Sequence, residues 1–343
     1  MDDKRFCPIP FREFRISTAG DLSLCSPRRL KIPIVGNILR DGVEGAWDSA
    51  RAQELRASIL DGSFRYCDPQ ICPALQCGSL PSVRGMKDPK YLDIIENDRT
   101  RIPSGPETLS LHYDPTCNLK CPSCRPEIIG LKGKHLDRVL KIQSLITDSA
   151  LLEGAKSLLL SGYGDVLASK SHLRLLRALT VERYPDLRII LLTNGLLLTP
   201  RMWDTFPGAH PLIREVAVSI DAATPETYRI NRGGQFDKLV ENLHFIKGLR
   251  EADRIETFRL NFVVQKNNFR EMPEFVRLGR SVSADRIIFQ KIGNAPNAGM
   301  DDYPDRAIHL PEHPDHAEFL NVIAAGELAD PIVDFYTLGS FKR

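Results

Sequence analysis

Three cysteines within eight residues constrain this chain more than any other feature of its sequence. Cys117, Cys121 and Cys124 follow a CxxxCxxC spacing, directly after a short apolar run at residues 109–113. A loop this tight can bring three thiolates to one metal centre. Structural zinc sites and [4Fe–4S] clusters usually take four protein ligands. The loop therefore needs a distant fourth ligand, or it leaves one coordination position open.

The other five cysteines also lie early in the chain, and residues 125–343 contain none. The start of the chain lacks the apolar segment of a secretory signal, so we expect a cytoplasmic protein whose cysteines bind metal rather than form disulfides. No stretch approaches the roughly 18 apolar residues of a membrane helix. With a net charge of +2 and no long basic run, we expect neither membrane nor nucleic-acid binding.

Residues 109–300 alternate short apolar runs with helical patterns, which predicts repeated βα units and a parallel sheet. We expect strands at residues 110–113, 157–160, 188–193, 215–220, 259–264 and 286–290. Helices are expected between them, at about residues 132–153, 170–180, 199–205, 236–251 and 270–281. In parallel barrels the active site lies at the C-terminal ends of the strands. The polar residues that follow these strands are therefore candidate site residues.

Residues 1–80 predict a small α+β module with its own metal ligands. A hairpin is expected at residues 11–26, because Gly20 supplies the turn. One helix is expected from about residue 43 to residue 60. Three cysteines then follow at four-residue gaps: Cys67, Cys72 and Cys77.

The rest of the chain carries no chemistry that the sequence reveals. Residues 81–108 are rich in charge and proline and are expected to be a linker, with a short helix near residues 89–96. Residues 301–343 are expected to close the barrel, with a helix around residues 312–326 and a strand-like piece at residues 332–336.

The cysteine loop and the βα pattern together resemble the radical S-adenosylmethionine (radical SAM) enzymes. The resemblance implies a partial (β/α)6 TIM-type barrel, in which Cys117, Cys121 and Cys124 bind a [4Fe–4S] cluster whose open iron chelates S-adenosylmethionine. It also implies cofactor contacts at later strand ends. A carboxylate would bind the amino group, a serine the ribose or carboxylate, and an arginine the methionine carboxylate. These cofactor-binding candidates are Gly162, Gly164, Asp165, Asn194, Ser219 and Arg232. Asp165 stands where the family more often has glutamate.

The N-terminal segment resembles the SPASM or twitch module, which carries auxiliary iron–sulfur clusters in some radical SAM enzymes. Cys7, Gly20 and Cys25 match the start of its pattern, with twelve and four residues between them. The module usually follows the barrel, whereas here it precedes it. The resemblance implies one auxiliary [4Fe–4S] cluster on Cys7, Cys25, Cys67 and Cys72, with Cys77 as the spare thiol or as the replacement for Cys72. Spacing alone leaves zinc on the same thiolates as the alternative.

The resemblance implies that the protein cleaves S-adenosylmethionine reductively and abstracts a hydrogen atom from a substrate. The favoured reaction is oxidation or epimerisation of a small carbohydrate-like metabolite, and in an epimerisation Cys77 would be the catalytic hydrogen donor. Radical modification of a ribosomally made peptide or protein is the alternative. Flavodoxin or ferredoxin is the expected electron donor. A zinc-stabilised, non-catalytic binding protein is the hypothesis from a different class.

Overall fold

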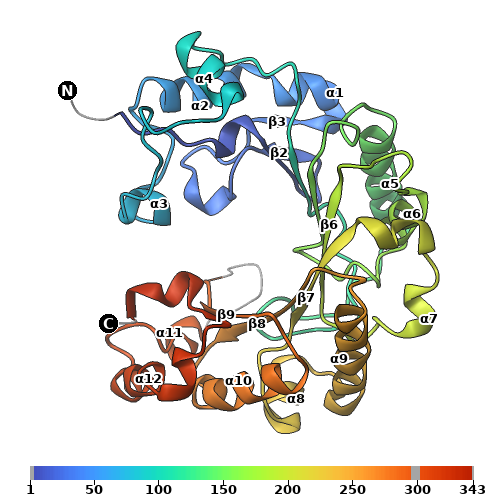
Figure 1. Cartoon of the computed structure of the whole chain (residues 1–343), viewed down its shortest axis with the longest axis vertical. Coiled ribbons are helices and arrows are strands. Elements are labelled where there is room, and N and C mark those ends of the chain that lie inside the picture. Colours follow the sequence, from blue (N-terminus) through green and yellow to red (C-terminus); the bar gives the residue numbers. More distant parts are fainter. Residues whose placement is uncertain (1–3, 295–301, 342–343) are drawn as a thin grey trace. The chain divides into compact units, whose positions relative to one another are not determined.

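The computed structural model describes residues 4–294 and 302–341 (Figure 1). These residues form two compact units, which we describe separately. The first comprises residues up to 115, residues 131–163 and residues 181–188, and the second comprises residues 116–130, residues 164–180 and the chain from residue 189 onward. The barrel boundary expected near residue 300 lies outside the described residues.

The sheet of the first unit combines the N-terminal hairpin with strands from later in the chain. It contains β1 (Glu13–Ile16), β2 (Asp21–Ser23), β3 (Gly36–Asn37), β4 (Thr108–Leu111) and β5 (Ser157–Leu160). β2 pairs antiparallel with β1 and β3, whereas β1, β4 and β5 run parallel. The predicted hairpin is confirmed, and Gly20 in its turn has a φ of +82°, which glycine adopts without steric cost. The hairpin thus extends the sheet that contains β4.

The helices of the first unit are α1 (Ile38–Trp47), α2 (Ala50–Leu60), α3 (Pro73–Gln76), α4 (Pro89–Glu96) and α5 (Gly133–Thr147). Figure 1 shows α1, α2 and α4 along the same side of β2 and β3. The prediction of one helix over residues 43–60 is wrong, because the chain divides there into α1 and α2. The Ser49 hydroxyl accepts the Ala52 N–H at 3.1 Å and so caps the start of α2. The short helix expected near residues 89–96 is confirmed as α4.

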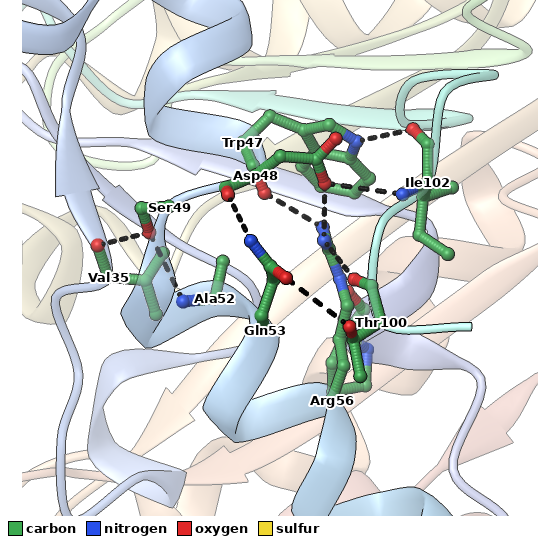
Figure 2. A network of polar contacts seen from close by, with 10 residues as sticks. Val35, Trp47, Asp48, Ser49, Ala52, Gln53, Arg56, Thr100 and Ile102 are labelled. Atoms are coloured by element: carbon green, nitrogen blue, oxygen red, sulfur yellow. Dashed lines mark hydrogen bonds and ion pairs between the residues drawn. The ribbon is translucent and has the colours of Figure 1, made fainter. Parts of the chain in front are cut away.

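Arg56 of α2 is fully buried and joins separate segments of the first unit (Figure 2). Its guanidinium donates to the carbonyls of Pro10 (3.0 Å), Trp47 (3.0 Å) and Thr100 (2.9 Å). It also pairs with the Asp48 carboxylate at 2.8 Å and lies 4.2 Å above the Trp47 ring. Burial lowers the pKa of Arg56 to about 10, against the opposing effect of Asp48. The side chain therefore stays charged at neutral pH, and its charge is fully partnered.

The second unit contains a parallel sheet in the order β6 (Arg188–Thr193), β7 (Ile213–Ser219), β8 (Thr257–Val264), β9 (Arg286–Lys291) and β10 (Val333–Asp334). Its helices are α6 (Lys170–Ala178), α7 (Pro200–Trp203), α8 (Pro225–Asn231), α9 (Phe236–Glu251), α10 (Met272–Ser281), α11 (Tyr303–Arg306) and α12 (His316–Ile323). Phe262 of β8 packs on Phe275 of α10, with ring centroids 4.7 Å apart. The expected α/β class is confirmed, and each of the six predicted strands is present as one of β4 to β9.

Candidate metal centres

The cysteine loop belongs to the second unit. The Cys117 N–H donates to the carbonyl of Ile129 at 3.0 Å, and the Cys124 N–H donates to the carbonyl of Cys121 at 2.9 Å. The Cys121 thiol is buried, that of Cys117 is half-buried and that of Cys124 is exposed. Backbone hydrogen bonds therefore hold the loop in a compact turn whose three thiols have different access to solvent.

Each thiol of the loop has a side-chain N–H donor near its sulfur. Asn194 Nδ2 lies 3.9 Å from Cys117 Sγ, and Arg232 Nη1 lies 3.7 Å from Cys121 Sγ. Arg125 Nη2 lies 3.5 Å from Cys124 Sγ. Donors of this kind stabilise a thiolate more than a neutral thiol, and two of the three carry a positive charge. The loop and its surroundings therefore fit a metal centre that takes three thiolates.

Arg232 is held at Cys121 by a buried ion pair. Its Nη2 lies 2.6 Å from Asp221 Oδ2, and the two side chains are 13% and 2% exposed. Asp221 also accepts the Val263 N–H at 2.7 Å. Burial raises the pKa of Asp221, and the neighbouring Arg232 opposes that shift. Burial likewise raises the pKa of Cys121, while Arg232 lowers it. The arginine therefore favours the charged form of both neighbours.

Asp165 lies at the centre of a second group of contacts in the same unit. Its Oδ2 accepts the Thr193 hydroxyl (2.8 Å) and the Asn194 N–H (2.7 Å), and its Oδ1 accepts the Leu167 N–H (2.9 Å). Its own N–H donates to the carbonyl of Thr116 at 2.8 Å, one residue before the cysteine loop. Asp165 thus links the end of β6 to that loop. Its contact with the amino group of S-adenosylmethionine stays a prediction.

The remaining predicted cofactor residues lie at strand ends in both units. Ser219 is the last residue of β7 and is half-buried, and Gly164 belongs to the second unit. Gly162 belongs to the first unit, where a Cβ added to it would come within 2.2 Å of His112 Nδ1. The absence of a side chain at Gly162 therefore makes room for the His112 imidazole. The roles of Ser219, Gly162 and Gly164 in cofactor binding stay predictions.

Four N-terminal cysteines act on one another electrostatically within the first unit. Burial raises the pKa of Cys7 to about 12, with repulsion from Cys25, Cys67 and Cys72 acting in the same direction. Burial also raises the pKa of Cys67 to about 11, with repulsion from Cys25 and Cys72. These charge effects link the four thiols electrostatically. This grouping fits a centre with four thiolate ligands, because a bound metal favours the deprotonated forms.

Among residues 4–294 and 302–341, no three Cys, His, Asp or Glu side chains are close enough to hold a single metal ion. The assignment of the loop cysteines and of the N-terminal cysteines to metal centres therefore stays a prediction.

The exposed Cys77 follows α3, and the thiols that repel Cys7 electrostatically are those of Cys25, Cys67 and Cys72 rather than that of Cys77. We therefore expect Cys72→Ala to remove the metal of the N-terminal centre, about half of the bound iron if both centres hold four-iron clusters. Cys77→Ala is the matched control and should keep the full metal content. Metal analysis of the two purified variants checks this, and the reverse pattern would assign the fourth ligand to Cys77.

Two charged residues of the loop site were not predicted from the sequence. Arg125 directly follows the third cysteine, and this adjacency is the signal that could have identified it. Asp221 follows the end of β7, in the same strand-end position as the residues that were selected.

No helix in the described part of the chain is long and apolar enough to span a membrane.

Comparison with protein families finds two matches in this chain. Residues 113–278 match the Radical SAM superfamily, and residues 7–78 match SPASM, an iron–sulfur cluster-binding domain. The first match contains the cysteine loop with its three donors, and the second contains all five N-terminal cysteines. A radical SAM domain takes a [4Fe–4S] cluster and S-adenosylmethionine, and a SPASM domain takes auxiliary iron–sulfur clusters.

Individual relatives are distant and cover only part of the chain. An AdoMet-dependent heme synthase from Methanosarcina barkeri is 30% identical over 193 residues, 53% of this chain and 49% of the relative. A GTP 3',8-cyclase from Alkaliphilus metalliredigens is 28% identical over 153 residues, 43% of this chain and 44% of the relative. This chain therefore spans about half the length of these relatives, or less. The structure of Streptococcus suis SuiB bound to S-adenosylmethionine has 18% identity and a TM-score of 0.40, covering 65% of this chain and 50% of SuiB.

Proposed function

Because the chain carries a radical SAM domain together with a SPASM domain, we propose that it oxidises or epimerises a small, polar substrate by hydrogen-atom abstraction. The observation that carries this proposal is the cysteine loop, in which each of the three thiols has its own N–H donor. The loop supplies three ligands, so the fourth position of a cluster stays available to S-adenosylmethionine.

In this proposal Cys117, Cys121 and Cys124 hold the catalytic cluster. When bound, the cluster supplies the electron that cleaves S-adenosylmethionine into methionine and a 5'-deoxyadenosyl radical, which removes a hydrogen atom from the substrate. The residues of the chain position these partners and keep out competing reactions. Asp165 fixes the end of β6 against the loop, so that Asn194 can donate to the Cys117 thiolate. Flavodoxin or ferredoxin is the proposed source of the electron.

The N-terminal centre accounts for the second half of an oxidation. A substrate radical becomes a closed-shell product when it loses a proton and one further electron. An auxiliary cluster on Cys7, Cys25, Cys67 and Cys72 would provide an acceptor for that electron. In an epimerisation the radical instead gains a hydrogen atom, and the exposed Cys77 thiol is a suitable donor. Both outcomes use thiols that the SPASM match contains.

Two observations support a small, polar substrate. The two curated relatives carry names that refer to heme and to GTP, which are small molecules rather than proteins. A single auxiliary centre also favours a small carbohydrate-like metabolite over a ribosomally made peptide, and the four interacting N-terminal cysteines could supply the ligands of one such centre.

The test uses sugars and aminocyclitols that carry deuterium at their carbinol carbons. The protein, purified without oxygen, is incubated with S-adenosylmethionine, dithionite and each labelled compound, and the 5'-deoxyadenosine is analysed by mass spectrometry. Transfer of deuterium into 5'-deoxyadenosine from one of these compounds is expected. Transfer from a carbon-deuterated peptide alone would move the substrate to the peptide class. A protein that holds both clusters and still cleaves no S-adenosylmethionine would overturn the proposed function.

A further inference from the structure

The three side chains that donate to the cysteine thiols differ in charge and in exposure to solvent. These differences affect the electrostatic environment of a cluster bound by the loop. The Asn194 amide is neutral, whereas Arg125 and Arg232 are cationic. Arg125 donates to Cys124, whose thiol is exposed, so water competes for that sulfur. Arg232 donates to Cys121, which is 6% exposed and therefore has little access to water. The largest electrostatic effect is expected at the buried pair, where screening by solvent is weakest.

Arg232 has its terminal nitrogens engaged within the protein. Nη1 faces Cys121 Sγ at 3.7 Å and Nη2 faces Asp221 Oδ2 at 2.6 Å. Asp221 is in turn fixed by the Val263 N–H at 2.7 Å, and its carbonyl accepts from the Asn231 side chain at 2.8 Å. A guanidinium held on two sides in this way has a fixed position relative to the sulfur. This arrangement favours a contact with the cluster ligand over a contact with the methionine carboxylate.

We propose that the Asp221–Arg232 pair is a positioning device that raises the reduction potential of the cluster bound by the cysteine loop, through the Arg232–Cys121 contact. The inference rests on the proposed function, because it requires an iron–sulfur cluster at this loop. Reduction adds one negative charge to a cluster. Arg232 contacts the ligand sulfur directly, so its positive charge outweighs the opposing charge of Asp221 and stabilises the reduced form more than the oxidised form. Hydrogen bonds to the sulfurs, net charge and solvent exposure are the general determinants of such potentials.

The experiment is a redox titration followed by EPR on the holoprotein and its variants. The barrel-cluster signal is identified as the one that disappears when Cys117, Cys121 and Cys124 are replaced by alanine. Arg232→Gln is expected to lower the ratio of reduced to oxidised cluster at least tenfold at a fixed potential, a shift of about 59 mV for one electron. Arg232→Lys keeps the charge and should restore most of the potential. Arg229→Gln, an exposed arginine on α8, is the matched control and should leave it unchanged.

Several outcomes would overturn the inference. If Arg232→Gln retains its iron and its potential is unchanged, or shifts no more than that of Arg229→Gln, the contact does not tune the cluster. The inference is also wrong if Arg232→Gln loses only its affinity for S-adenosylmethionine. That result would indicate that Arg232 binds the methionine carboxylate of S-adenosylmethionine. If Arg232→Gln loses its iron, the potential of Arg125→Gln is measured in its place. A smaller decrease in potential is expected for Arg125→Gln, and an unchanged potential would contradict the inference. An unmodified protein without iron at the loop would instead defeat the proposed function.

Discussion

Replacing Cys117, Cys121 and Cys124 together by alanine is expected to abolish the formation of 5'-deoxyadenosine. The variant loses all three thiolates of the loop, and nothing else in the loop can replace three sulfur ligands. Iron should decrease by about four atoms per chain, the content of one [4Fe–4S] cluster. The assay combines protein purified without oxygen, S-adenosylmethionine and dithionite, with 5'-deoxyadenosine measured by chromatography.

Cys77→Ala is the control for the loss of a thiol outside the loop, and it should still form 5'-deoxyadenosine when dithionite supplies the electron. The N-terminal centre provides a second control, since the alanine triple variant should keep its iron there. Formation of 5'-deoxyadenosine by the triple variant at the level of the unmodified protein would contradict the assignment of the catalytic cluster. Loss of iron from both centres would show that the substitutions had unfolded the protein.

The second large effect is expected for Arg56→Ala, which should destabilise the first unit by about 3–5 kcal/mol, the usual cost of removing one partner from a buried ion pair. The substitution leaves the carbonyls of Pro10, Trp47 and Thr100 without their donor. It also removes the cation that stacks on the Trp47 ring. The free energy of unfolding, measured by chemical denaturation, checks this expectation.

The same substitution should weaken the N-terminal centre. Pro10, whose carbonyl Arg56 holds at 3.0 Å, lies three residues after Cys7, so Arg56→Ala loosens the segment that presents this ligand. Iron of the N-terminal centre should therefore be lost before iron of the loop. Arg51→Ala is the matched control, because Arg51 is exposed on the same helix and exposed substitutions usually change stability by less than about 0.5 kcal/mol. Equal stability of the two variants would show that the network contributes little.

The positions of the strands could be predicted because each apolar run is short and ends at a turn signal. The break between α1 and α2 was missed, although Asp48 and Ser49 are residues typical of helix ends. The role of Arg56 could not be predicted, since its partners Pro10 and Thr100 lie 46 and 44 residues away in the sequence. A long-range carbonyl contact leaves no local pattern to recognise.

The candidate site shows the same division between local and long-range information. The three cysteines of the loop were identified from spacing alone, and the family resemblance pointed to Asn194 and Arg232. Their contacts with the Cys117 and Cys121 thiols depend on the arrangement of β6 and α8 relative to the loop, which only the structure provides. The Asp221–Arg232 ion pair likewise depends on a turn after β7, where Asp221 has a φ of +61°. Residue type predicted the chemistry, and the fold determined the partners.

The measurement that tests the central claim most directly is the iron, sulfide and zinc content of the unmodified protein, purified without oxygen. Two cysteine groups that hold [4Fe–4S] clusters require about eight irons and about eight sulfides per chain, with no zinc. About four irons per chain, all lost when the loop cysteines are replaced, would be consistent with the catalytic cluster alone. The proposed oxidation would then lack its electron acceptor. Zinc at both groups with no iron would contradict the radical SAM reaction and indicate a zinc-stabilised binding protein.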